Sequence, residues 1–233
     1  RILNTLEAEG LSENTLIIYT SDHGDGHASH KWNQKMTFYE EAINVPFIMA
    51  WKGQISEGVI DRDTLINSGI DIFPSICAAA GIKPADSLHG ENLFDSSKPP
   101  RDYVVAEMLQ ANRKSDSPEE YIGRMVVSTH FKYILFDCGN NREQLFDLAK
   151  DPGECFPVTT DPAYRSTLEQ HRAYLKEWIS ATQDDSKSRA ILSSYVNIRR
   201  AERDFSRPQR SSSGTMFGTA TGSVPCRTES GMA

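Results

Sequence analysis

The sequence predicts an α/β fold class, with an α/β domain followed by a smaller antiparallel sheet and helix. Residues 2–9 carry apolar positions at helical spacing, and residues 15–20 form a continuous apolar run of strand length. A helix, a short loop and a buried strand in succession are typical of an open α/β sheet. Beyond a Gly-, Pro- and Ser-rich connection at residues 87–101, short strand candidates alternate with turn signals, which indicates an antiparallel sheet.

Length and charge limit the classes of function. The 233 residues suffice for about one and a half domains. The formal net charge of −7 argues against a broad surface for nucleic acid or anionic membrane, because a basic excess supplies that affinity. No run of about 18 apolar residues is present, so a membrane span is not expected. The chain opens on Arg1 in a helical pattern, and we interpret it as a piece of a longer protein.

Two strands are predicted in the first half. Residues 15–20 (TLIIYT) and 45–51 (VPFIMAW) are continuous apolar runs, the pattern of strands covered on both faces. A short helical turn is predicted between them at residues 37–42. Because open α/β sheets bind ligands beyond the carboxyl ends of their strands, the polar loop after residue 20 is expected to carry chemistry.

A helix is predicted over residues 68–80. Its apolar face is expected to comprise Ile70, Phe73, Cys77 and Ala80. Pro74 falls inside this span, and because proline suits the first turn of a helix, we expect the helix to begin near residue 72 or 73.

The second half is predicted to hold four short strands and a long helix. The strand candidates are residues 103–107, 124–128, 132–136 and 143–146, with a hairpin turn at Asn140-Asn141. Asp161-Pro162 is expected to cap a helix. Its packing stripe is Tyr164, Leu168, His171, Leu175 and Trp178. We therefore expect domains over residues 1–98 and 99–184, then a weak helix and a disordered tail over residues 185–233.

Titratable side chains gather directly after the first predicted strand. His23, His27 and His30 are three of the chain's 6 histidines, and they lie beside Asp22 and Asp25. An adjacent carboxylate and imidazole can reach one cation where glycines let the backbone turn sharply. These residue types leave zinc, manganese or iron open, and an oxygen-rich completion would favour calcium or magnesium. A solvated polar loop with chance histidines is the alternative.

Lys35 follows in the same loop and suits an oxyanion substrate as a compact point charge. Taken alone, it would usually be a surface lysine. Trp32 suits the face of a sugar ring or simple packing. His89-Gly90 is either a loop that approaches the cleft or an exposed connector. Arg124 is expected to be a structural or salt-bridging arginine.

Three motifs together resemble the sulfatase family of the alkaline phosphatase superfamily. They are TSDHG at residues 20–24, KMTFYEE at residues 35–41 and VPFI at residues 45–48. NSGIDIFPSI at residues 67–76 and NREQLFDLAKDPGE at residues 141–154 are also similar to family segments. The resemblance implies the C-terminal part of an alkaline-phosphatase-like α/β sandwich domain, followed by a small antiparallel-sheet-plus-helix subdomain.

The resemblance also implies roles by position. Asp22 and His23 match the family's metal ligands, which usually bind calcium, so Ca2+ is the expected divalent cation. Lys35 matches the lysine that holds the sulfate and offsets charge on the leaving oxygen, and His30 matches a histidine near the substrate. Lys35 and His30 are thus the expected catalytic and substrate-binding residues. The implied reaction is hydrolysis of a sulfate ester by a formylglycine hydrate, in a sulfuric ester hydrolase.

The sequence departs from the family at the nucleophile. In the family the formylglycine motif, of the form C/S-x-P/A-x-R, is expected near the N-terminus, and none of the 4 cysteines of this chain stands in it. We expect formylglycine in a more N-terminal part of the protein, and we expect this chain alone to be inactive. Two alternatives stay open: a phosphonate or phosphate ester hydrolase of the same superfamily, and a non-catalytic metal- or glycan-binding module.

Substrate and location follow only from the resemblance. A sulfated glycan is the implied substrate class, and no nucleic-acid partner is expected. Family members are usually exported, which implies a periplasmic, secreted or lysosomal protein.

Overall fold

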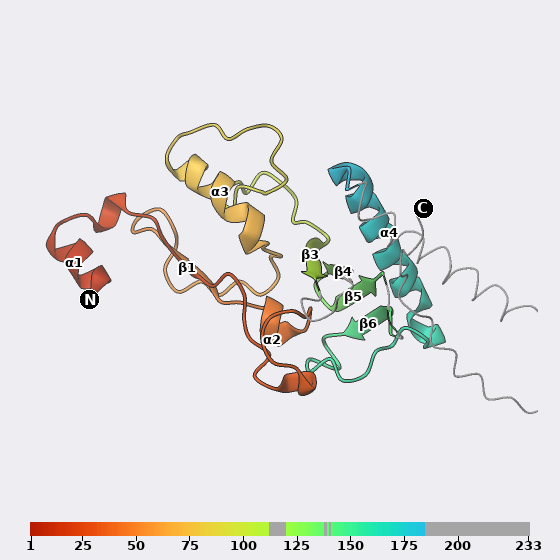
Figure 1. Ribbon diagram of the computed structural model, residues 1–233. Coiled ribbons are helices and arrows are strands. Elements are labelled where there is room, and N and C mark those ends of the chain that lie inside the picture. The colour runs from red at the N-terminus through yellow and green to blue at the C-terminus, as the bar shows by residue number, and fades with distance from the viewer. Residues whose placement is uncertain (112–119, 138, 140, 185–233) are drawn as a thin grey trace, which may run out of the picture. The chain divides into compact units, whose positions relative to one another are not determined.

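The computed structural model describes residues 1–111, 120–137, 139 and 141–184 (Figure 1). The chain divides into two compact units, Arg1–Val104 and Val105–Ala233. Asn140 and the helix and tail expected over residues 185–233 lie outside the described residues. None of the described helices combines enough length and apolarity to cross a bilayer.

The first unit holds short helices around a two-stranded antiparallel ribbon. Its elements are α1 (Ile2–Ala8), η1 (Ser12–Asn14), β1 (Ile17–Thr20), η2 (Ser29–Lys31), α2 (Glu40–Ile43), β2 (Phe47–Ala50) and α3 (Ser68–Ala79). Both predicted strands are present, and Tyr19 of β1 lies opposite Ile48 of β2. The prediction that both strands are covered on both faces is wrong for the described chain, because Tyr19 is 62% exposed and Ile48 57% exposed. A ribbon of two strands cannot cover its own faces.

Helix α3 begins at Ser68, earlier than the position predicted from Pro74. The side chain of Asn67 accepts a hydrogen bond of 3.2 Å from the Gly69 amide and so caps the helix. Pro74 has no N–H to donate to the Ile70 carbonyl. Gly90 packs against that carbonyl, where a Cβ would come within 1.9 Å of the oxygen. The glycine therefore permits a backbone contact at the place where proline interrupts the helix.

The buried face of α3 carries two polar residues, and it is not the apolar face predicted from the sequence. The residues it buries are Asp71, Pro74, Ser75 and Cys77. Of the four residues expected on the packed face, only Cys77 is buried. The side of α3 that carries a carboxylate faces inward because other parts of the chain provide hydrogen-bond donors for it there.

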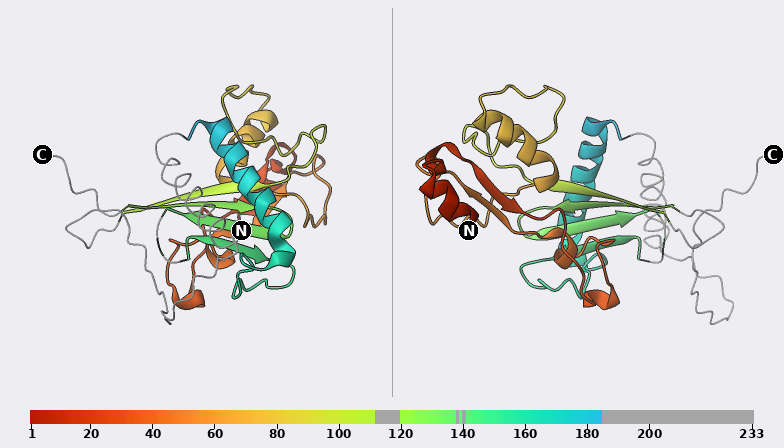
Figure 2. Two further views of the ribbon diagram at one scale, coloured as in Figure 1. Left: turned by 90° about the vertical axis from the view of Figure 1, so that its right-hand side faces the viewer. Right: turned by 60° about the vertical axis from the view of Figure 1, so that its left-hand side comes forward.

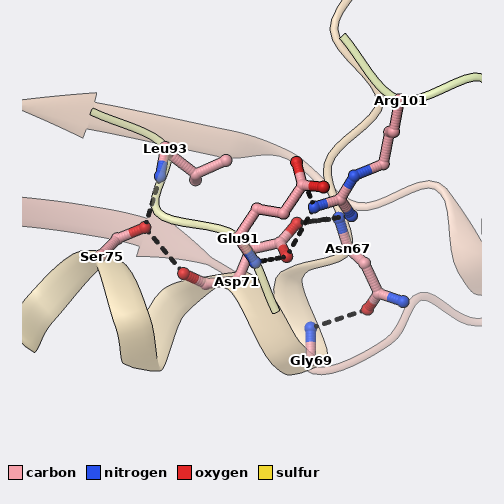
Figure 3. A network of polar contacts seen from close by, with 7 residues as sticks. All are labelled: Asn67, Gly69, Asp71, Ser75, Glu91, Leu93 and Arg101. Atoms are coloured by element: carbon pink, nitrogen blue, oxygen red, sulfur yellow. Dashed lines mark hydrogen bonds and ion pairs between the residues drawn. The ribbon is translucent and has the colours of Figure 1, made fainter. Parts of the chain in front are cut away.

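That carboxylate belongs to Asp71, which is fully buried and accepts hydrogen bonds from three places in the chain (Figure 3). Arg101 donates to it through Nη1 at 3.1 Å and Nη2 at 3.0 Å. The Asn67 amide donates at 2.7 Å and the Glu91 amide at 2.9 Å. Ser75 Oγ accepts from the Leu93 amide at 3.0 Å. The network fixes the connection at residues 89–101 on α3.

The second unit is an antiparallel sheet with one long helix on it (Figures 1 and 2). The strands β3 (Val104–Ala111), β4 (Glu120–Val127), β5 (Phe131–Phe136) and β6 (Glu143–Asp147) lie in that order. η3 (Pro162–Tyr164) leads into α4 (Arg165–Thr182), which contacts β4 and β5. All four predicted strands and the helix are confirmed.

Side chains of α4 and of the sheet bury a mixed core. Leu168, His171 and Leu175 of the predicted stripe are buried. Asp161 caps the start of η3 by accepting from the Ala163 amide at 2.9 Å. Arg124 is 3% exposed and forms ion pairs with Asp184 and Glu107 at 2.6 and 2.9 Å, as expected.

Candidate active site

The candidate site is the loop between β1 and α2. Two glycines let it fold back on itself and onto α2. The Gly24 amide donates to the Ala42 carbonyl at 2.8 Å, and a Cβ at Gly24 would lie 1.9 Å from the Glu41 carbonyl oxygen. The Gly26 amide donates to Gln34 at 3.0 Å. The first of these hydrogen bonds joins the start of the loop to α2, and the second joins the two halves of the loop to each other.

The loop has an unusual concentration of left-handed backbone. Positive φ angles occur at His27 (43°), Ala28 (73°), His30 (52°), Lys31 (59°) and Gln34 (72°). None of these residues is glycine, so each conformation carries a steric cost. Surrounding hydrogen bonds must hold this shape, and such strain gathers at functional sites.

Three of the four predicted site residues come together at the carboxyl end of β1. His23 Nδ1 lies 2.7 Å from the Gly24 carbonyl oxygen. Because a carbonyl only accepts, Nδ1 carries the proton and Nε2 keeps its lone pair. Lys35 Nζ lies 2.8 Å from that Nε2, and Asp22 Oδ2 lies 3.5 Å from it. A carboxylate and an ammonium thus meet at one imidazole nitrogen.

The pKa of Asp22 lies below its ordinary value, as the net result of opposing effects. Partial desolvation would raise the pKa of Asp22, but the His23 ring, the His23 amide hydrogen bond and the Lys35 charge together lower it. The Asp22 side chain is 82% exposed and that of His23 is 37% exposed. Asp22 is therefore an accessible, ionised carboxylate, as a cation ligand requires.

The fourth predicted residue, His30, is held by a different pair of partners. Its ring stacks on Tyr39 with 3.8 Å between ring centroids and 7° between planes. Its Nε2 lies 3.8 Å from Glu41 Oε2. Sequence reasoning assigned no role to Tyr39 and Glu41, although both lie in the KMTFYEE motif.

The remaining polar residues of the loop lie at the surface. The Asp25 carboxylate accepts from the His27 amide at 2.9 Å, and this hydrogen bond is the main reason that the pKa of Asp25 is lowered. The His27 side chain is 88% exposed. Trp32 and His89 are also exposed.

Comparison with known proteins gives a consistent result. A family model described as Sulfatase matches residues 1–82. The chain is 36% identical over 193 residues to the "Delta 4,5-hexuronate-2-O-sulfatase" of Bacteroides thetaiotaomicron, a match that covers 80% of the chain and 39% of the relative.

Two solved structures have the same fold over most of the chain. A 2-O GAG sulfatase superimposes with a TM-score of 0.69 at 33% identity, over 80% of this chain and 41% of that one. A structure in complex with its substrate D-glucosamine-2-N,6-O-disulfate gives a TM-score of 0.64 at 25% identity, over 80% and 38% of the two chains. The chain thus spans less than half the length of each of these three proteins.

Proposed function

The chain belongs to the sulfatase family of the alkaline-phosphatase-like superfamily, and on that premise we propose that the whole protein hydrolyses sulfate esters of carbohydrates, with Asp22, His23 and Lys35 in its active site. The observation that supports this most is the 2.8 Å approach of Lys35 Nζ to His23 Nε2, next to Asp22. This arrangement provides for a cation and for an anionic group at one place.

The donor set fits a divalent cation. Asp22 offers a carboxylate, and the Gly24 carbonyl holds His23 in the tautomer with a lone pair on Nε2. That lone pair faces Lys35 Nζ in this structure, and it would become a cation ligand once the Lys35 ammonium turns to the sulfate. Asp22 and His23 would hold the ion, and calcium is the proposed identity because the family usually uses it. Such an ion supplies Lewis-acid stabilisation of negative charge on the sulfate group.

The chain's own residues bind and orient the substrate. Lys35 carries an ammonium that can donate hydrogen bonds to sulfate oxygens and stabilise the charge that develops on the leaving oxygen. The Gly24 tether positions the loop from its base. His30, stacked on Tyr39, is proposed to contact the substrate. The nucleophile, a formylglycine, is proposed to lie in a part of the protein outside this sequence.

A sulfated glycan is the proposed substrate class. Two of the most similar proteins, at 36% and 33% identity, are named a hexuronate-2-O-sulfatase and a 2-O GAG sulfatase. We also propose that the protein is exported, as these enzymes usually are.

The direct test uses the whole protein with competing esters. We expect hydrolysis of 4-nitrophenyl sulfate and of a 2-O-sulfated unsaturated hexuronate disaccharide, at rates well above those for 4-nitrophenyl phosphate and a phenyl phosphonate ester. Lys35→Ala should remove most of the sulfatase activity. Preferred hydrolysis of the phosphate or phosphonate would favour the superfamily alternative, and clear turnover by the present chain alone would contradict the proposed position of the nucleophile.

A further inference from the structure

A serine and a histidine of the second unit form a hydrogen-bonded pair where the β4–β5 hairpin meets α4. Ser128 Oγ lies 2.9 Å from His171 Nε2. Ser128 directly follows the last residue of β4, and His171 lies in α4, which contacts both β4 and β5. The packing of the helix on the sheet therefore brings together two residues that are 43 positions apart in the sequence.

The direction of this hydrogen bond follows from the other nitrogen of the ring. His171 Nδ1 lies 2.8 Å from the Thr167 carbonyl oxygen. Because a carbonyl only accepts, Nδ1 carries a proton, and burial, which lowers the pKa of His171, keeps the ring neutral at neutral pH. Nε2 thus has a lone pair that accepts the Ser128 hydroxyl. The Phe131 carbonyl oxygen lies farther from Ser128 Oγ, at 3.4 Å, and competes weakly for that proton.

The imidazole of His171 is held in place from several sides. Its residue is 3% exposed. Phe131 packs edge-on against the ring with 5.9 Å between centroids, and Tyr174 does so with 5.7 Å. Together with the Thr167 carbonyl, these rings keep Nε2 directed at Ser128. A hydroxyl bonded to a base that a third group orients is the arrangement of an activated nucleophile.

The hydroxyl lies at an open end of the hairpin. Ser128 is half-buried, and the next two residues, Thr129 and His130, are exposed. The Ser128 amide is engaged, because it donates to the Phe131 carbonyl at 2.9 Å. Within the part of the chain that the structure describes, the Thr129 amide meets no hydrogen-bond acceptor. The amide that follows the nucleophile is a common donor to the oxyanion in serine hydrolases, so a donor of this kind is available here.

We propose that Ser128 is a nucleophile that accepts the acyl group of small activated carboxylic esters, with His171 as its general base. Ser128 Oγ bonds to the ester carbonyl carbon while its proton moves to His171 Nε2, and the Thr129 amide donates to the oxyanion. Collapse of this intermediate breaks the bond to the leaving oxygen, which departs with the electron pair and takes the proton from Nε2. The products are an acyl ester of Ser128 and a free alcohol or phenol. The inference is independent of the proposed sulfatase activity, because neither Asp22 nor Lys35 takes part.

The test treats the full chain with 4-nitrophenyl acetate and locates acetyl groups on its peptides by mass spectrometry over time. We expect acetylation of Ser128, and His171→Gln should slow it by roughly 10²-fold or more, the usual contribution of a general base. The matched control is Ser180, an exposed serine of α4. Its acetylation should be far slower than that of Ser128, and His171→Gln should not change it.

A second measurement needs no variant. In concentrated urea, unfolding separates Ser128 from His171, and acetylation of Ser128 should slow to the rate of Ser180. Circular dichroism verifies that His171→Gln is folded when its rate is measured. Two results would overturn the proposal: acetylation of Ser128 no faster than that of Ser180 in the folded chain, or a rate at Ser128 that neither His171→Gln nor urea lowers. A Ser128–His171 hydrogen bond that only joins the hairpin to α4 would give such results.

Discussion

Lys35 Nζ and Asp22 Oδ2 approach the same atom, Nε2 of His23, at 2.8 and 3.5 Å. A carboxylate favours a cation and an ammonium favours an anion, so under the proposed function Asp22 would serve the ion and Lys35 the substrate. Their roles can be separated by experiment because each can be removed without the other.

Asp22→Ala in the whole protein is expected to weaken Ca2+ binding and abolish turnover. Lys35→Ala should leave Ca2+ affinity close to wild type and lower turnover by roughly 10²–10³-fold, because it removes one stabilising group for transition-state charge. Calorimetric titration with Ca2+ and sulfatase assays measure the two effects. Lys52→Ala, at an exposed lysine of the same unit, is the control. Equal loss of Ca2+ affinity in both site variants would contradict these roles.

Asp71→Asn is expected to destabilise the chain by about 1.5–3 kcal/mol, because it removes the buried counter-charge of Arg101 and leaves the partly exposed Glu91 as its carboxylate partner. Urea unfolding followed by tryptophan fluorescence gives the free energy of unfolding. The exposed Asp63 provides the control Asp63→Asn, which should change stability little. A similar stability for both variants would show that the Asp71 network contributes nothing.

Gly90→Ala is expected to destabilise the chain by about 1–3 kcal/mol, since the added Cβ would lie 1.9 Å from the Ile70 carbonyl oxygen and force the backbone apart. Gly69→Ala is the matched control inside α3, where the nearest atom to an added Cβ is 3.4 Å away. That change should be neutral or stabilising, because alanine favours helix. The thermal melting temperatures of the two variants provide the comparison, and a melting temperature of Gly90→Ala equal to wild type would be incompatible with the close contact.

His171 is expected to make stability depend on pH. Burial lowers the pKa of His171 below its ordinary 6.5, against a smaller opposing effect of the Thr167 carbonyl. The folded chain therefore binds this proton less readily than the unfolded chain, and the free energy of unfolding should fall as the pH drops below 6.5. The decline is at most about 1.4 kcal/mol per pH unit for one group.

Urea unfolding at several pH values between about 5 and 8 measures this dependence. His171→Gln should flatten the profile below pH 6.5. His89→Gln, at an exposed histidine, should leave it unchanged. A wild-type profile as flat as that of His171→Gln would show that His171 does not titrate differently in the folded state.

The positions of the helices and strands could be predicted from the sequence, but the buried face of α3 could not. Apolar runs located β1 and β2, and the spacing of Leu168, His171 and Leu175 located the buried face of α4. The buried face of α3 could not be predicted, because it depends on Arg101, which lies 30 residues from its partner Asp71. Local periodicity carries no information about such a contact.

The candidate site, too, could be predicted only in part. TSDHG and the following lysine predicted which residue types gather, and the 2.8 Å contact of Lys35 with His23 agrees with that expectation. The stack of His30 on Tyr39 was not predicted. The backbone at His30 is left-handed, with φ of 52°, a conformation that non-glycine residues rarely adopt and that the sequence does not predict.

The left-handed conformations between His27 and Gln34 mean that this loop could not be transplanted as an isolated peptide. A left-handed conformation costs a non-glycine residue about 1–2 kcal/mol, so an isolated synthetic peptide of this segment would leave the conformation. A graft onto another scaffold would have to bring the Ala42 carbonyl that receives the Gly24 amide, because the shape is imposed from outside the segment that displays it.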